Sequence, residues 1–125
     1  MEEHWRWRLK MARRIAAELD PARFGVAAIY LTGSTKNATA GPGSDIDLIV
    51  HFTGSDEQEK ELRSWFGAWS RRLAAMNFER TGQASDGLLD VHFVTDQDIE
   101  AKTSYAVKIG AVTDAARPLA LREAS

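Results

Sequence analysis

Residues 31–52 read LTGSTKNATAGPGSDIDLIVHF, and this segment gives the clearest indication of the fold. The apolar run that leads into it, 26–31 (VAAIYL), contains β-branched and aromatic residues and predicts a buried strand. Residues 35–44 are small and polar, and the Gly-Pro-Gly at 41–43 marks them as a loop. Residues 45–52 (DIDLIVHF) predict a second strand.

Two carboxylates begin this second strand. A strand places residues i and i+2 on one face about 6.5 to 7 Å apart, so Asp45 and Asp47 project together while Ile46 and Leu48 point the other way. Like charges this close repel each other unless a cation lies between them. Because the chain has no cysteine, such a cation needs oxygen or imidazole ligands, which favours Mg²⁺ or Mn²⁺. The pair predicts a metal site.

A third carboxylate stands in the run LLDVHFV, residues 88–94, which predicts a third strand. Asp90 lies between apolar neighbours and shares its face with His92. A lone acid in a buried strand is costly unless it is paired or bound to a metal. If this strand lies beside the second, Asp90 completes a carboxylate triad. The alternative is an aspartate on an edge strand that faces water. His92 fits a packed or hydrogen-bonded neighbour better than a ligand.

Gly33 and Ser34 end the first strand and can open a helix. The backbone N–H groups at a helix start, together with the positive end of its dipole, receive phosphate oxygens. Glycine allows a close approach, and the serine hydroxyl adds a donor. The alternative is an ordinary turn, or an N-cap at Ser34.

The rest of the chain predicts helices around a small sheet. Apolar residues recur at helical spacing before Asp20-Pro21 and again within 57–76, and 97–109 is a further helix candidate, whereas the tail after Pro118 has no assignment. Lys108 fits an exposed helical position better than a phosphate contact. The predicted class is α/β (α+β), with a small mixed β-sheet flanked by helices. The apolar residues of the first stripe are Trp5, Leu9, Ala12, Ile15, Ala16 and Leu19.

Size and composition limit the function classes. A chain of 125 residues with 44% hydrophobic residues predicts one domain over 1–125 with one active site. No apolar run is long enough for a membrane span or secretory signal, so we expect a cytoplasmic protein with no membrane partner. The net charge of -2 makes nucleic acid a possible but not a favoured partner.

Together these residues resemble the nucleotidyltransferase superfamily that includes DNA polymerase β, in particular its minimal prokaryotic members. The resemblance rests on LTGS, ten intervening residues, DIDL and LLDV, and it covers residues 26–94. It implies a polymerase β-like fold, in which Asp45 and Asp47 ligate two metal ions, and Asp90 ligates the catalytic one and helps to activate the nucleophile. The residues that would bind the β- and γ-phosphates of a nucleoside triphosphate, with ATP favoured, are Gly33 and Ser34.

The same segments also resemble nucleotidyltransferase domains associated with pyruvate-phosphate-dikinase-like or phosphoenolpyruvate-synthase-like proteins. One departure from the superfamily concerns charge, because many minimal members continue Gly-Ser with arginines, as in Gly-Ser-Arg-Ala-Arg-Gly, whereas this chain reads GSTKNATAG. Lys36 is the candidate for the missing charge, although a lysine cannot form a bidentate guanidinium clamp.

The predicted reaction is magnesium-dependent transfer of a nucleoside monophosphate, AMP from ATP, to an acceptor hydroxyl on a protein, a small molecule or RNA, with release of pyrophosphate. We expect a partner protein or a second copy to complete the acceptor site. The alternative is a regulatory module of the same fold that binds a nucleotide without turnover. The presence of all three acids favours the enzyme.

Overall fold

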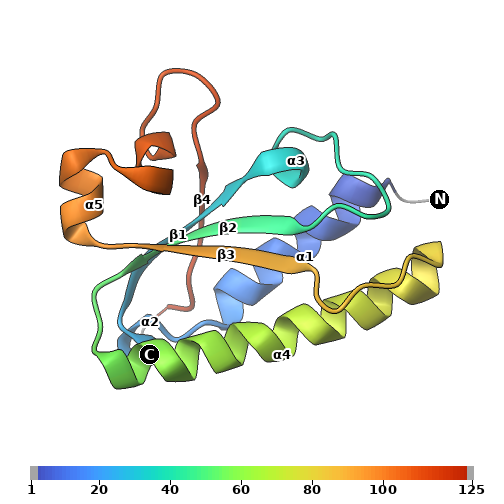
Figure 1. Cartoon of the computed structure of the whole chain (residues 1–125), viewed down its shortest axis with the longest axis horizontal. Helices are drawn as coiled ribbons and strands as arrows, with labels where there is room; N and C mark the ends of the chain where they lie inside the picture. Colours follow the sequence, from blue (N-terminus) through green and yellow to red (C-terminus); the bar gives the residue numbers. More distant parts are fainter. Residues whose placement is uncertain (1–2, 124–125) are drawn as a thin grey trace.

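The computed structural model describes residues 3–123, apart from the side chain of Ser104. In this part of the chain a four-stranded sheet has the order β3-β2-β1-β4 (Figure 1). Strand β2 pairs with β1 in antiparallel fashion and with β3 in parallel, and β4 joins the other edge of β1 in antiparallel fashion. The strands are β1 (Val26–Thr32), β2 (Ile46–Phe52), β3 (Leu89–Val94) and β4 (Arg117–Leu119).

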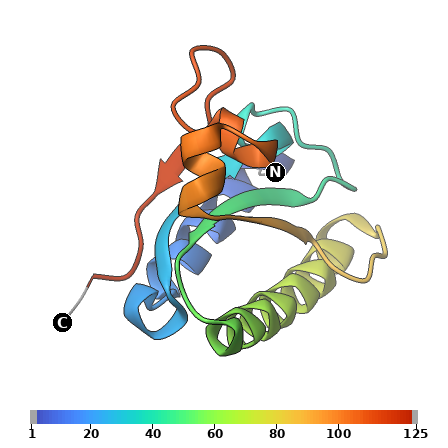
Figure 2. The same cartoon turned by 60° about the vertical axis from the view of Figure 1, so that its left-hand side comes forward.

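Helices lie on both sides of this sheet. Figure 2 shows α1 (His4–Glu18) and α4 (Asp56–Thr81) on one side, and α5 (Asp96–Ala101) with the 3-10 helix η1 (Ser104–Lys108) on the other. Two single-turn helices, α2 (Pro21–Phe24) and α3 (Gly33–Lys36), precede and follow β1. The predicted mixed sheet flanked by helices is therefore confirmed.

The larger core lies between the sheet and the pair α1 and α4. From β2, Ile46, Leu48 and Val50 point into it and are fully buried, as the alternation of a strand requires. The stripe predicted for α4 also packs there, with Trp65 and Met76 only partly buried. Helix α4 runs five residues beyond the predicted end at 76, because Asn77 continues the buried face and Gly82 ends the helix. The stripe residues of α4 in this core are Leu62, Trp65, Phe66, Trp69, Leu73 and Met76.

Helix α1 packs on a face slightly different from the predicted one. Trp5 and Leu9 are only partly buried, whereas Trp7 and Met11, outside the predicted stripe, are 4% and 7% exposed. Two neighbouring stripes of this helix contain apolar residues at helical spacing, one with Trp5 and Leu9 and one with Trp7 and Met11. Contact with the sheet determines which stripe is buried. The buried stripe also contains Arg8.

A smaller cluster covers part of the opposite face of the sheet. Ile49 of β2 and Val94 of β3 pack there against Ala106 of η1 and Ala116. Strand β2 is thus buried on both faces at its centre, which explains why apolar residues continue without alternation at 48–50. At the Asp47 end of the same face, the sheet carries Asp47, Asp90 and His92, and we call this region the polar face.

The C-terminal part differs from its prediction. The expected helix over 97–109 is divided into α5 and η1, because Lys102 adopts a left-handed conformation with φ 54° and ends α5. The tail contributes β4, whose pairing with β1 has no signature in its sequence. No helix among the described residues combines the length and the hydropathy needed to cross a membrane.

Candidate functional site

Asp47 and Asp90 form the centre of the polar face. They are Cα partners in the parallel pairing of β2 and β3, so their side chains lie next to each other on one face. The condition for the expected carboxylate triad, that the third strand lies beside the second, is therefore met. The expected burial of Asp90 is wrong, because β3 is an edge strand and the Asp90 side chain is 49% exposed. Asp90 thus lies at the edge and also beside Asp47.

His92 joins these two carboxylates. Among the described residues, Asp47, Asp90 and His92 form the group whose ligand atoms all lie within 4.8 Å of one another. The His92 Nε2 atom is 3.2 Å from Asp90 Oδ2, and the imidazole ring stacks on Tyr105 of η1 with centroids 3.6 Å apart. The sequence places His92 on the face of Asp90 but favours a packed neighbour over a ligand, because a strand pattern does not show how close its ring comes to Asp47.

Asp45 lies just before β2 and is exposed. It is outside the group formed by Asp47, Asp90 and His92 within the described chain, yet it remains close enough to act on them electrostatically. Partial burial and the charge of Asp90 raise the pKa of Asp45, whereas the guanidinium of Arg8 lowers it. The three predicted acids therefore interact electrostatically, and Asp45 lies farther from the other two than they lie from each other.

The charges of this face make the ionised form of Asp47 unfavourable. Burial first, and then the carboxylates of Asp90 and Asp45, raise the pKa of Asp47 to about 6, against a smaller opposing effect of His92. A bound cation would reverse this effect, since it favours the ionised form. Two carboxylates and an imidazole also provide the oxygen and nitrogen donors that Mg²⁺ or Mn²⁺ accepts. The residues thus fit a divalent metal ion.

Gly33 lies in contact with this carboxylate. Its φ of +75° falls in the left-handed region, and a Cβ built on it would lie 2.2 Å from Asp47 Oδ2. Glycine is therefore required for the backbone conformation and for the space that Asp47 occupies. Gly33 is the first residue of α3, which therefore begins directly beside Asp47 and the polar face.

The turn around Gly33 contains hydroxyl groups without protein partners. Thr32, and not Ser34, is the N-cap of α3, and its side chain makes no capping hydrogen bond. The alternative in which Ser34 caps the helix is therefore wrong. Thr32 Oγ1 and Thr35 Oγ1 are the buried side-chain atoms of the described residues that have no hydrogen-bond partner. Since buried polar groups are normally satisfied, these two are notable beside a candidate ligand site.

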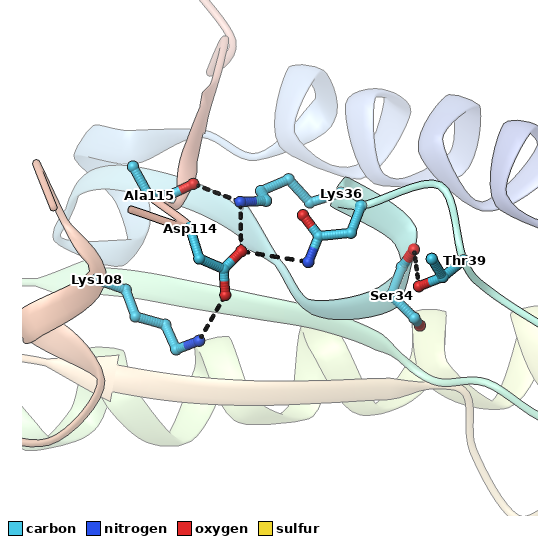
Figure 3. A network of polar contacts seen from close by, with 7 residues as sticks. Ser34, Lys36, Thr39, Lys108, Asp114 and Ala115 are labelled. Carbon is cyan, nitrogen blue, oxygen red and sulfur yellow. Dashed lines mark hydrogen bonds and ion pairs between the residues drawn. The ribbon is translucent and has the colours of Figure 1, made fainter. Parts of the chain in front are cut away.

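Lys36 is held by the C-terminal segment. Its ammonium lies 2.7 Å from Asp114 Oδ1 and donates to the carbonyl of Ala115 at 2.8 Å. Figure 3 shows Lys36 extending toward Asp114 and away from Ser34. Lys108 approaches the same carboxylate at 3.6 Å. The ammonium of Lys36, which was predicted to contact a phosphate, thus forms an ion pair that joins α3 to the segment before β4.

Comparison with known proteins agrees with this geometry. No curated protein matches the chain. The sequence matches the family described as nucleotidyltransferase domain over residues 9–110, which include β1, α3, β2 and β3 and all the acids of the polar face. This match spans most of the chain and supports the resemblance to the polymerase β superfamily. The chain therefore belongs to the nucleotidyltransferase domain family and is a transferase of nucleotidyl groups.

Proposed function

We propose that the protein transfers AMP from ATP to an acceptor hydroxyl and releases pyrophosphate, with Mg²⁺ or Mn²⁺ held by Asp45, Asp47 and Asp90. The observation that carries this proposal is the placement of Asp47 and Asp90 as neighbours across β2 and β3. The raised pKa of Asp47 supports it, because a carboxylate surrounded by like charges has a strong affinity for a cation.

In the reaction, the acceptor oxygen forms a bond to the α-phosphorus, and the bond from that phosphorus to the bridging oxygen of pyrophosphate breaks. A divalent metal held by Asp45, Asp47 and Asp90 would neutralise charge on the triphosphate and lower the pKa of the attacking hydroxyl. Asp90 receives the hydroxyl proton, and its exposure gives the acceptor access to it. His92 lies close enough to Asp90 to pass that proton on to water.

The turn at the start of α3 is the proposed site for the triphosphate. Gly33 lets the backbone of the turn lie against the carboxylate of Asp47, so the N–H groups of the turn would receive phosphate oxygens close to the metal ligands, and Ser34 donates its hydroxyl to a β- or γ-phosphate oxygen. The unpartnered hydroxyls of Thr32 and Thr35 lie in the same turn, and a small rearrangement on ligand binding would satisfy them. Lys36 reaches a phosphate only if it leaves Asp114.

For the acceptor, we propose the hydroxyl of a protein side chain. The carboxylate of Asp90 is half exposed on an edge strand, so a large acceptor can reach it without opening of the fold. A partner protein or a second copy would then provide the surface that holds the acceptor. An aminoglycoside hydroxyl and an RNA 3′ end are the outcomes that the experiment must separate from this one.

The test uses ATP labelled at the α- or the γ-phosphate, with Mg²⁺, and offers a cell protein fraction, aminoglycosides and short RNA as acceptors. We expect the α-label on protein, equimolar pyrophosphate, and no transfer of the γ-label. Asp90→Asn is expected to remove the transfer, whereas Asp86→Asn, an exposed aspartate in the turn before β3, is the matched control. Transfer of the γ-label, or pyrophosphate release that does not need Asp90, would contradict the proposal.

A further inference from the structure

Arg8 is a buried arginine that the reaction described above does not use. It lies in α1 and is 0% exposed, although a guanidinium is always charged. Burial lowers the pKa of Arg8, and the carboxylate of Asp45 opposes this effect. None of the ion pairs among the described residues includes Arg8. A buried charge is tolerated only when its donors are satisfied, so its hydrogen bonds define its role.

Two of these hydrogen bonds go to the loop that precedes Asp45. The Arg8 Nε atom donates to the carbonyl of Ser44 at 2.9 Å, and one terminal nitrogen donates to the carbonyl of Pro42 at 3.3 Å. The same terminal nitrogen donates to Asn77 Oδ1 at 3.0 Å. A fourth bond, from the other terminal nitrogen, returns to the carbonyl of His4 in the same helix. The planar fork of arginine suits several carbonyls at once.

Asn77 strengthens this arrangement from α4. It is 2% exposed, and its amide nitrogen donates to the carbonyl of Pro42 at 2.8 Å. The Pro42 carbonyl thus accepts from α1 and from α4, and Arg8 and Asn77 bind each other. The two long helices of the molecule therefore meet on one peptide group of the loop.

The loop needs such support because its own residues do little to restrict its backbone conformation. It contains Gly41 and Gly43, and a Cβ at Gly41 would meet no other atom, so packing does not hold it there. Its internal bonds close a single turn between Gly41 and Ser44. Glycine loses more conformational entropy on ordering than other residues, so external bonds must fix the loop.

We propose that Arg8, together with Asn77, is a positioning residue that fixes the loop 42–44 and thereby the carboxylate of Asp45 at the metal site. Asp45 is the residue directly after Ser44, so a shift of the Ser44 peptide moves it. Asp47 is less dependent on the loop, because β2 begins at Ile46 and is paired on both sides. The proposal rests on the proposed function in that Asp45 is taken as a metal ligand.

The test compares Arg8→Met, Arg8→Lys and Asn77→Ala with Arg13→Met, which removes an exposed arginine from the same helix. All measurements use the full chain at a temperature where circular dichroism shows each variant to be folded. Hydrogen exchange by mass spectrometry reports the order of residues 41–46, and electron paramagnetic resonance measures Mn²⁺ affinity. Steady-state kinetics of pyrophosphate release gives kcat and KM.

The sign of the change in Mn²⁺ affinity separates positioning from charge. Removal of a nearby positive charge would by itself strengthen cation binding, so weaker binding in Arg8→Met reports displacement of Asp45. We expect faster exchange confined to 41–46, Mn²⁺ binding weakened about tenfold, and kcat lowered about ten- to a hundredfold with little change in KM. Arg8→Lys keeps the charge but lacks the fork, so it should not rescue either property. Asn77→Ala should give a smaller effect in the same direction.

Several results would overturn the inference. They are unchanged exchange at 41–46 in Arg8→Met, tighter Mn²⁺ binding, full rescue by Arg8→Lys, or a lowered melting temperature with normal kcat in the folded protein. A wild-type protein that binds no Mn²⁺ and releases no pyrophosphate would contradict the proposed function instead. In that case the exchange of residues 41–46 still decides whether Arg8 holds the loop.

Discussion

Asp47 and Asp90 are direct neighbours across the parallel pairing of β2 and β3, although α4 separates them in the chain. Their proximity makes the pKa of Asp47 depend on Asp90 as well as on burial. The fold thus brings together two groups that repel each other in the absence of a cation. This relationship provides the most direct tests of the site.

Asp47→Asn should abolish nucleotidyl transfer and leave the fold intact, because it removes a charge that the metal needs but no core volume. It should also raise the melting temperature of the metal-free protein at pH 7.5, since the cost of burying an ionised carboxylate and its repulsion from Asp90 and Asp45 both disappear. Transfer of α-labelled AMP and thermal melting measure the two effects. Asp86→Asn, outside the site, should change neither, and normal turnover by folded Asp47→Asn protein would refute the assignment.

Metal affinity should depend on pH through Asp47. Its pKa in the folded protein is raised to about 6, so a proton competes with the metal below that pH. Apparent Mn²⁺ affinity should therefore rise by up to about tenfold per pH unit below pH 6 and level off above it. Because the folded pKa lies above the unfolded value, the metal-free protein should lose stability as pH rises from about 4 to 6, with no further loss from this group above. Titrations between pH 5 and 8 with flat affinity would exclude this role.

Gly33→Ala should impair catalysis far more than stability. A left-handed conformation costs a non-glycine residue about 1 to 2 kcal/mol, and here the added Cβ also displaces the carboxylate of Asp47. We expect kcat to fall about a hundredfold in the folded protein. Gly82→Ala is a matched control, because Gly82 has a similar φ of +77° but open space around it. It should lose a similar amount of stability and keep its kcat, and equal kinetic losses in both variants would speak against the contact.

Ser34→Ala should weaken use of the triphosphate without a capping penalty, because Thr32 and not Ser34 is the N-cap of α3. A hydrogen bond to a charged group contributes roughly 1.5 to 3 kcal/mol, so kcat/KM for ATP should fall about ten- to a hundredfold. Ser55→Ala removes a true N-cap, that of α4, and should cost about 1 kcal/mol of stability with normal kinetics. Unchanged ATP kinetics in Ser34→Ala would remove Ser34 from the phosphate site.

Asp114→Asn should increase the affinity for a non-hydrolysable ATP analogue, because Asp114 holds the ammonium of Lys36 that we assign to a phosphate. Ion pairs with an exposed partner are weak, so the gain should be about two- to fivefold. Calorimetry measures it, with Asp96→Asn as an exposed control whose partner is His51. Equal affinities would show that Lys36 only anchors the segment before β4.

Some of the site follows from local sequence alone. The period of a strand places Asp45 and Asp47 apart from Ile46 and Leu48, and the structure buries both apolar residues. The position of Gly33 between a strand and a helix is also a local property, set by its positive φ. These features need no knowledge of what packs against them.

The other features of the site were set by the tertiary structure. They depend on contacts between segments far apart in the chain, and the local sequence pattern does not predict which segments meet. Asp90 lies at an exposed edge because no strand within the described residues 3–123 pairs with the outer side of β3. His92 joins the carboxylates with its ring stacked on Tyr105, and Lys36 turns to Asp114, through packing of the C-terminal segment. The burial of Arg8 is the clearest example of a feature that the sequence pattern does not predict. A helical pattern identifies an arginine as polar and therefore solvent-facing, whereas the carbonyls of a glycine-rich loop far away in the sequence, together with Asn77 of α4, satisfy its donors and make its burial favourable.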